Sequence, residues 1–186
     1  REYRGKLVRK PAGQPHEIAV NGRDEWVGWF ELVPAQVNAG NVSKLRPTAL
    51  IQTGIVAVFE SSPIVVDGVM YISTANNNVQ AYDAVTGRIL WRYAPRLDFS
   101  NLCCGPVSRG VGVAYGKVFV AQLDGRVVAL DARDGHVLWR TEQAATLPAD
   151  PTFYSFTMAP QVLDGMVIVG SSGAEYPTRG FVQAYD

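Results

Sequence analysis

The sequence has few of the side chains that enzymes most often use for nucleophilic chemistry. Only two cysteines and two histidines occur among its 186 residues. No Ser/His/Asp triad, phosphate-binding loop or His-x-x-x-His pairing appears, which argues against familiar hydrolase and nucleotide chemistry. Net charge is absent as well, because 17 basic residues balance 17 acidic ones. Since no basic run occurs either, we expect no nucleic acid partner.

Long apolar runs are also missing. None approaches the ~20 residues that a helix needs to cross a bilayer, and no charged and then apolar leader precedes Arg1. We therefore expect a soluble chain from which any leader has already been removed. The composition, with 47% hydrophobic and 18% charged residues, is that of an ordinary globular domain able to bury a core.

The most extended pattern in the sequence is an internal repeat. A shift of 48 residues aligns the run 68–72 with 116–120, the run 81–83 with 129–131, and Trp91 with Trp139. A third copy begins at Pro160 and reaches Asp186, with a longer middle. Repeats of this period are typical of propellers and solenoids.

Each repeat consists of short, alternating, β-rich segments, which in the first unit fall at 64–66, 69–74, 79–82 and 88–93. They predict an all-β propeller of four-stranded blades, with blades at about 55–93, 105–142 and 152–186, the last one truncated. The elements 83–87 and 131–135 predict tight turns, in which an aspartate caps backbone amides and a glycine takes a positive φ. Trp91 and Trp139 are expected to wedge against the neighbouring blade, or alternatively to be unrelated core residues.

Residues 1–50 do not show the repeat and are expected to form an irregular lead-in. Within this region, 38–45 predicts a short capped turn, and 48–53 predicts a strand that could join the closing blade of a ring. Propellers usually close with about four to eight blades, whereas residues 51–186 supply roughly three of them. We therefore expect a fragment of a longer protein, whose exposed sheet faces would favour self-association.

Cys103 and Cys104, the only cysteines, are neighbours, and Arg109 follows shortly after them. Consecutive Cα atoms lie about 3.8 Å apart, less than the roughly 4.4 to 6.8 Å of an ordinary disulfide, so a bridge would close a strained ring of the kind usually kept at functional sites. An oxidised pair would offer a polarizable surface to a planar ring and would imply a non-cytosolic compartment. A reduced pair of small buried residues is the alternative. Zinc is not expected, because His16 and His136 lie in unrelated segments.

The segment 170–180 forms the second cluster of candidate residues. The successive backbone amides of Ser172, Gly173 and Ala174 predict a site for an anion such as a carboxylate. Glu175 offers hard oxygens suited to a calcium-type cation. Thr157 opens the third unit as Glu60 opens the first, so both could face the same end of the propeller axis. For Glu60, a solvated loop carboxylate is the alternative interpretation.

These residues together resemble the quinoprotein alcohol dehydrogenases, a family that includes methanol dehydrogenase. The resemblance rests on the cysteine pair followed by Val107-Ser108-Arg109-Gly110, on Gly173-Ala174-Glu175 ending in Arg179-Gly180, and on the Ala-x-Asp-x-x-Thr-Gly…Trp repeats. It covers about residues 38–186 and is weaker over the first 35. It implies a propeller of about eight blades that holds pyrroloquinoline quinone (PQQ) near its axis, with a calcium or lanthanide ion.

The resemblance also implies roles for individual residues. Cys103 and Cys104 would form a vicinal disulfide against one face of the quinone, and Glu175 would be a metal ligand. The residues that would hydrogen-bond or cradle the cofactor are Glu60, Arg109, Thr157, Ser172, Gly173 and Ala174. The family's catalytic aspartate, its asparagine metal ligand and the tryptophan over the other quinone face would lie beyond Asp186. No catalytic base is therefore named here, and the chain alone is expected to be inactive.

The implied protein is a periplasmic enzyme that oxidises a small alcohol by hydride transfer to the quinone and passes electrons to a cytochrome c or a membrane quinone. One alternative is a non-catalytic propeller that serves as a periplasmic scaffold for membrane-protein assembly. It would share the tryptophan pattern but would need neither the cysteine pair nor Glu175. Another alternative is a sugar- or peptide-binding propeller that uses the loop aromatics Phe153, Tyr154 and Tyr176.

Overall fold

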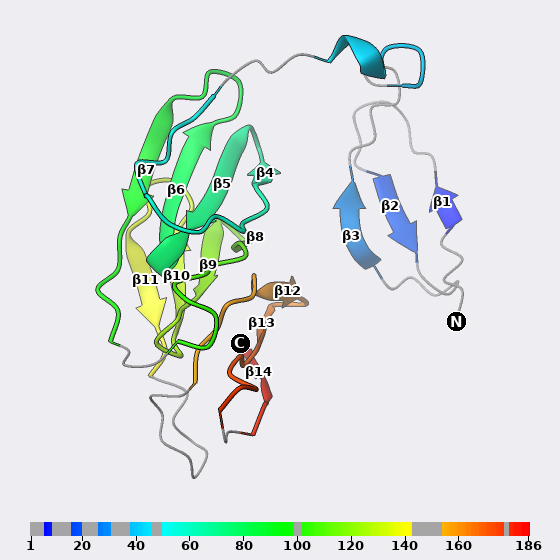
Figure 1. Cartoon of the computed structure of the whole chain (residues 1–186). Helices are drawn as coiled ribbons and strands as arrows, with labels where there is room; N and C mark the ends of the chain where they lie inside the picture. The colour runs from blue at the N-terminus through cyan, green and yellow to red at the C-terminus, as the bar shows by residue number, and fades with distance from the viewer. Residues whose placement is uncertain are drawn as a thin grey trace. The chain divides into compact units, whose positions relative to one another are not determined.

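The computed structural model describes residues 6–8, 16–19, 26–30, 38–45, 50–98, 102–142, 154–176 and 179–186. The chain divides into two compact units, Arg1–Thr48 and Ala49–Asp186. Among the described residues, the regular elements are antiparallel β-strands and two short 3₁₀ helices (Figure 1). None of the helices in these described ranges has the length and apolar character needed to cross a membrane.

The first unit contains a small antiparallel sheet where an irregular lead-in was expected. Its strands are β1 (Lys6–Val8), β2 (His16–Ala19) and β3 (Trp26–Phe30), in the order β1-β2-β3. The strands have only 3 to 5 residues each. Segments this short show too few alternations for periodicity to identify them from the sequence, which is why the lead-in was read as irregular.

The turn predicted at 38–45 is found, and it contains the 3₁₀ helix η1 (Val42–Lys44), whose N-cap residue Asn41 makes no side-chain capping bond to the helix. The side chain of Asn38 accepts the backbone N–H of Gly40 at 2.9 Å, and that of Asn41 accepts the N–H of Asn38 at 2.6 Å. The strand expected at 48–53 is not found at residues 50–53, which have no regular secondary structure. Residues 48 and 49 lie outside the described ranges.

The described residues of the second unit form three sheets that follow the repeat, and this confirms the predicted all-β fold. The first sheet contains β4 (Ile64–Val66), β5 (Val69–Thr74), β6 (Asn78–Asp83) and β7 (Ile89–Tyr93), with the 3₁₀ helix η2 (Ala75–Asn77) between β5 and β6. The second contains β8 (Gly112–Ala114), β9 (Lys117–Ala121), β10 (Val127–Asp131) and β11 (Val137–Arg140). The third contains β12 (Gln161–Leu163), β13 (Met166–Gly170) and β14 (Val182–Tyr185).

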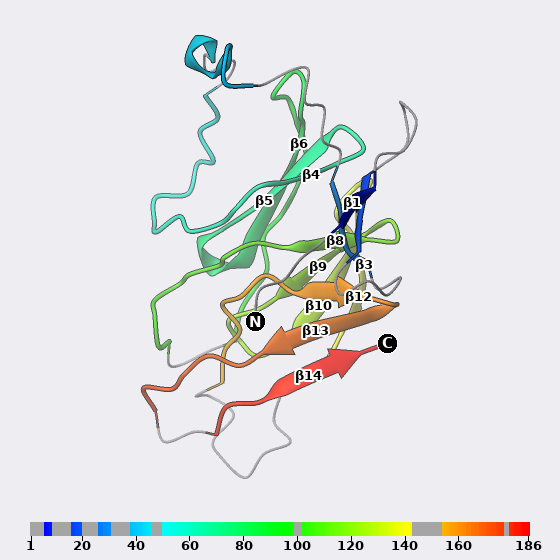
Figure 2. The same cartoon turned by 90° about the vertical axis from the view of Figure 1, so that its right-hand side faces the viewer.

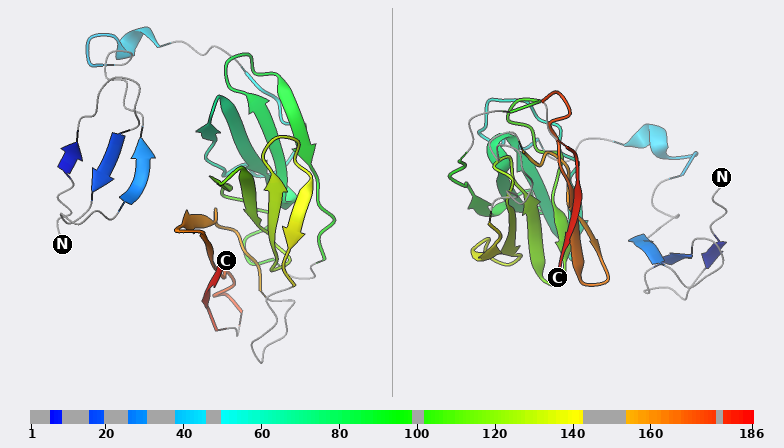
Figure 3. Two further views of the ribbon diagram at one scale, coloured as in Figure 1. Left: turned by 180° about the vertical axis from the view of Figure 1, so that it is seen from behind. Right: turned by 90° about the horizontal axis from the view of Figure 1, so that it is seen from below.

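Each sheet is an antiparallel meander in which neighbouring strands along the chain pair with each other. Figure 2 and Figure 3 show the three sheets one after another in chain order. Consecutive meanders packed face to face are the arrangement of propeller blades. We therefore refer to them as the first, second and third blade.

The turn between the third and fourth strand of a blade has the predicted chemistry. In the first blade, the carboxylate of Asp83 accepts the backbone N–H groups of Val85 and Thr86 at 3.0 and 2.8 Å, and Gly87 has a φ of 70°. In the second blade, Asp131 accepts the N–H of Arg133 at 2.8 Å. The aspartate therefore fixes the turn, while glycine supplies a backbone conformation that other residues rarely adopt.

Trp91 wedges between the first two blades, as predicted. Its side chain is buried, and its Nε1–H donates to the carbonyl of Ala132 in the turn of the second blade at 3.0 Å. Gly135, in the same turn, lies directly against the indole ring, so that a Cβ at this position would be 2.5 Å from a ring carbon. The tryptophan of one blade therefore packs directly against the turn glycine of the next blade.

The second blade is buried on both faces. Val118, Val120, Val128 and Leu130 pack toward the first blade in one hydrophobic cluster, whereas Phe119, Ala121, Val127 and Ala129 pack toward the third blade in another. Trp139 contacts the second cluster, with its ring centroid 5.9 Å from that of Phe119. Alternate residues of a strand point to opposite faces, so burial of both faces explains the nearly continuous apolar sequence of β9 and β10.

Candidate functional site

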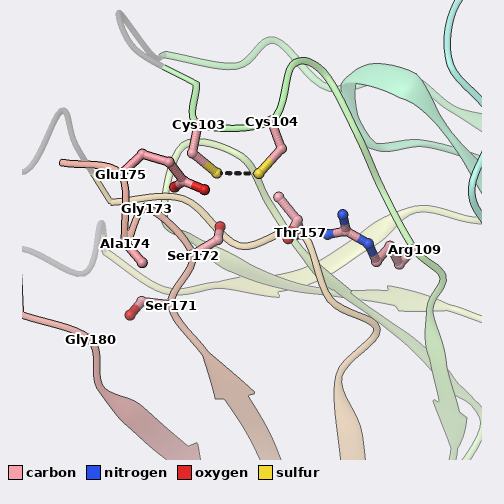
Figure 4. A pocket seen from close by; sticks show the side chains of 10 residues that line it. All are labelled: Cys103, Cys104, Arg109, Thr157, Ser171, Ser172, Gly173, Ala174, Glu175 and Gly180. Carbon is pink, nitrogen blue, oxygen red and sulfur yellow. Dashed lines mark hydrogen bonds between the residues drawn. The ribbon is translucent and has the colours of Figure 1, made fainter.

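Three segments of the second unit meet around a cavity of about 360 Å³, within the range of about 300 to 1,000 Å³ typical of small-molecule sites. The segments are the connection between β7 and β8, the stretch that precedes β12, and the loop between β13 and β14. The lining residues are Cys103, Cys104, Arg109, Thr157, Ser171, Ser172, Gly173, Ala174, Glu175 and Gly180 (Figure 4). A cavity of similar size on the first blade is lined mainly by apolar side chains and has no charged residue in its lining. The charged and polar lining of the first cavity therefore marks it as the candidate site.

The two cysteines lie on the rim of this cavity. Their sulfur atoms are 2.6 Å apart, and both residues are free thiols in this structure. Figure 4 shows the sulfurs side by side, next to the Glu175 carboxylate. The disulfide therefore remains a prediction, whereas the structure directly shows a polarizable sulfur pair facing the cavity.

The electrostatic surroundings of the cysteine pair do not favour a nucleophilic role. The hydrogen bond with Cys103, partial burial and the negative charge of Glu175 raise the pKa of Cys104 to about 11. Since the thiolate is the nucleophilic form of cysteine, a thiol with this pKa is almost entirely unreactive at neutral pH. The sulfur pair is thus suited to contact a ligand rather than to attack one.

Arg109 is held in place by two neighbours. Its Nε–H lies 3.2 Å from the carboxylate of Glu60, and its terminal N–H donates to the hydroxyl of Thr157 at 2.6 Å. The backbone N–H of Arg109 also donates to the carbonyl of Thr157 at 2.9 Å. A guanidinium group has five N–H donors, so donors remain for an oxygen of a ligand. Because Thr157 accepts from Arg109, its own hydroxyl proton can be donated to the same ligand.

The loop between β13 and β14 carries the candidate metal ligand. Where the loop leaves β13, the backbone N–H of Ser171 donates to the carbonyl of Phe181 at 3.0 Å. Within the loop, the backbone N–H of Tyr176 donates to the carbonyl of Gly173 at 3.0 Å. The hydroxyl of Tyr176 donates to the carbonyl of Leu102 at 3.1 Å, just before the cysteine pair. This contact ties the Glu175 loop to the cysteine loop.

The prediction that three successive backbone amides bind an anion is wrong for the amide of Ser172. Its backbone N–H donates to the carbonyl of Ser155 at 2.9 Å, and its hydroxyl donates to the same carbonyl at 2.8 Å. The amide of Ser172 is therefore not available to a bound anion, because an isolated bridge pairs these two residues. A short backbone bridge of this kind leaves no periodic signal in the sequence.

Eight of the nine residues predicted for the site line the cavity. The ninth, Glu60, is not part of the lining and reaches the site through its ion pair with Arg109. Sequence reasoning missed Ser171 and Gly180 as lining residues. A signal existed for both, since Ser171 precedes Ser172 in the same loop and Gly180 ends the Arg179-Gly180 motif. The predicted metal ligand Glu175 has its carboxylate within 4.8 Å of both sulfur atoms.

The chain belongs to the PQQ family of β-propeller dehydrogenases. The family model for the glucose/ethanol/alcohol dehydrogenase β-propeller domain matches residues 32–186. This confirms the resemblance drawn from the cysteine pair, the Glu175 loop and the repeats. The match begins within the first unit, ahead of the blades.

Several characterised proteins are similar to this chain. A cytochrome c-linked 1-butanol dehydrogenase of Thauera butanivorans is 48% identical over 68% of the chain and 18% of its own length. The quinohemoprotein alcohol dehydrogenase ADH IIB of Pseudomonas putida is 44% identical over 81% of the chain and 22% of its length. A solved europium-containing methanol dehydrogenase superposes with a TM-score of 0.72 at 39% identity, over 81% of the chain and 27% of that protein. The chain thus spans about a fifth of the length of the curated relatives it matches.

Proposed function

We propose that the protein to which this chain belongs is a PQQ-dependent alcohol dehydrogenase, and that the cavity described above forms one side of its cofactor site. The observation that supports this most strongly is the meeting of a sulfur pair, an arginine and a carboxylate in one cavity. These groups come from separate segments of the chain, and the family resemblance assigns all of them to the same cofactor.

The cavity fits a planar, anionic quinone. Arg109 and Thr157 supply N–H and O–H donors for carboxylate or carbonyl oxygens, and charge-assisted hydrogen bonds of this type are the stronger ones. The sulfur pair supplies a polarizable surface for the face of the ring. We propose that Cys103 and Cys104 form a disulfide in the mature protein, and hence that the protein is periplasmic, since disulfides persist mainly outside the cytosol.

The fit to a metal ion is partial, and it defines what the rest of the protein must supply. Glu175 offers carboxylate oxygens of the kind that calcium and lanthanide ions prefer, whereas the neighbouring sulfurs are soft ligands that such ions do not favour. Calcium takes about 6 to 8 oxygen ligands, so most of the ligands would come from the cofactor and from residues outside this chain. Glu175 would supply one of the ligands of the ion.

The chemistry that a bound quinone and ion supply is hydride acceptance and Lewis-acid polarisation, and the alcohol is the hydride donor. The residues of this chain would bind and orient the cofactor: Arg109 and Thr157 would hold its oxygens, and Glu60 positions Arg109 through their ion pair. No residue of the chain is assigned as the catalytic base, and we propose that the 186-residue chain alone is inactive. The name of one relative, the cytochrome c-linked 1-butanol dehydrogenase, supports a cytochrome c as the electron acceptor.

Reconstitution of the whole apoprotein tests this proposal. Alcohol-dependent dye reduction is expected only when PQQ and either Ca²⁺ or a lanthanide ion are both added. Glu175→Gln should weaken metal-dependent activation, because the amide removes a charged ligand. Asp164→Asn is a matched control, since Asp164 lies in the turn that precedes β13, at the other end of that strand from the Glu175 loop. Dye reduction without added quinone would contradict the assignment of PQQ as the cofactor. A lack of dye reduction in the presence of both quinone and metal would contradict the proposed activity and would favour a non-catalytic propeller.

A further inference from the structure

Three buried serine hydroxyls form a chain beneath the site. The hydroxyl of Ser108 donates to that of Ser73 at 2.9 Å, and the hydroxyl of Ser73 donates to that of Ser61 at 3.2 Å. The backbone N–H of Ser73 also donates to Ser61, at 3.2 Å. The residues Ser108, Ser73 and Ser61 are 3%, 0% and 8% exposed, respectively. Because the hydroxyls are shielded from water and point in one direction, they can reinforce one another.

The two ends of this chain adjoin the two partners of the ion pair at the site. Ser61 follows Glu60 directly, and Ser108 directly precedes Arg109. Ser73 lies in β5 and connects them. The hydroxyl chain therefore links the segment before the first blade to the segment before the second blade, at the point where each one presents a charged side chain.

The repeat itself does not require a hydroxyl at position 73. The shift of 48 residues places Ala121 at the equivalent position of β9, where it is also buried, and Gly170 ends the corresponding strand β13. The strand therefore accepts a small side chain of any polarity at this point. Among the three described blades, only the first, which directly follows Glu60, has a hydroxyl there, so the repeat alone does not account for Ser73.

The ion pair needs support from outside itself. The side chains of Arg109 and Glu60 are 45% and 39% exposed, and exposed pairs contribute little by themselves. Long side chains on two separate segments keep one geometry only if their backbones are fixed. The buried hydroxyl chain fixes both backbones one residue away from the charges.

We propose that Ser61, Ser73 and Ser108 are positioning residues that align Glu60 and Arg109 for binding of the quinone. This inference rests on the proposed function. The hydroxyl chain sets the position of the guanidinium group, which then meets the cofactor oxygens without reorganisation. The serines touch no ligand themselves and act through the ion pair.

Quinone affinity of the whole apoprotein, measured by quenching of tryptophan fluorescence, tests the proposal. Ser73→Ala introduces the residue that the second blade has at this position, and we expect it to weaken PQQ binding about tenfold, equivalent to about 1.4 kcal/mol. Thr74→Val is the matched control: Thr74 Oγ1 is buried in the same strand and has no hydrogen-bond partner among the described residues. It should leave the affinity unchanged.

A double-mutant cycle separates positioning from a general loss of structure. In a Glu60→Gln background, Ser73→Ala should cost much less affinity than in the wild type, because the pair it aligns is already broken. Ser108→Ala breaks a single link and should act in the same direction, so it replaces Ser73→Ala if that variant does not fold. Wild-type affinity in both serine variants, or an undiminished Ser73→Ala effect in the Glu60→Gln background, would overturn the inference and leave the proposed function standing. A wild-type apoprotein that does not bind PQQ would overturn both.

Discussion

Replacement of Gly135 by alanine is expected to disrupt the interface between the first two blades. Gly135 has a φ of +77°, and a Cβ built on it would lie 2.5 Å from Cε3 and 2.7 Å from Cδ2 of Trp91. These are ring atoms of a side chain that is only 8% exposed. The indole cannot move aside freely, because its N–H is bonded to the carbonyl of Ala132.

Two costs contribute to the expected effect. A left-handed backbone costs a non-glycine residue roughly 1 to 2 kcal/mol, and an extra methyl group in a packed core costs about 1 to 3 kcal/mol. We therefore expect Gly135→Ala to lower the free energy of unfolding by about 2 to 5 kcal/mol. The shift of the urea midpoint of the whole protein, followed by tryptophan fluorescence, measures this loss.

Gly116→Ala is the control that separates backbone strain from the clash. Gly116 has a similar φ of +68°, but a Cβ there would meet nothing within 4 Å. It should therefore show the strain cost alone. Gly135→Ala should cost less in a Trp91→Phe background than in the wild type, because the smaller ring leaves room for the added methyl group. If Gly135→Ala is no more destabilising than Gly116→Ala, the wedge between Trp91 and Gly135 does not hold the blades together.

Three further predictions concern other contacts. Asn77→Ala should cost about 1 to 3 kcal/mol of stability, because it leaves the buried N–H of Leu123 and carbonyl of Ala121 unpaired, whereas the exposed Asn76→Ala should cost less in the same denaturant assay. Arg133 lowers the pKa of Asp131 below its ordinary 3.8, so Arg133→Ala should reduce thermal stability above that pH and lose its effect as the pH falls below it. In the reduced protein, alkylation of Cys104 should be slow at neutral pH and should rise as the pH approaches about 11; fast labelling at pH 7 would contradict the raised pKa.

Much of the blade architecture could be predicted because its sequence signals are local. The turn aspartates, the glycines with positive φ and the alternating strands recur with the repeat, and the strands predicted in the first blade match β4 to β7 closely. The sheet of β1, β2 and β3 could not be predicted, since each strand is short and no repeat supports it.

The residues of the site were predictable to a similar degree, but the hydrogen bonds that connect them were not. The cysteine pair, Arg109 and Glu175 were recognisable by residue type and spacing. The bridge between Ser155 and Ser172, which occupies an expected amide donor, depends on how two distant loops meet. The hydroxyl chain of Ser61, Ser73 and Ser108 is equally invisible in the sequence, because serine is common and its partners lie on different strands.

The cofactor content of the whole protein, purified from a host that makes PQQ, tests the central claim most directly. Acid extraction followed by mass spectrometry should recover stoichiometric quinone from the wild type. The variant that combines Arg109→Ala with Thr157→Ala, and so removes the guanidinium and hydroxyl donors that we assign to the cofactor, should yield little quinone while remaining folded. A wild type without quinone, or equal quinone in both proteins, would contradict the assignment of this cavity as the cofactor site.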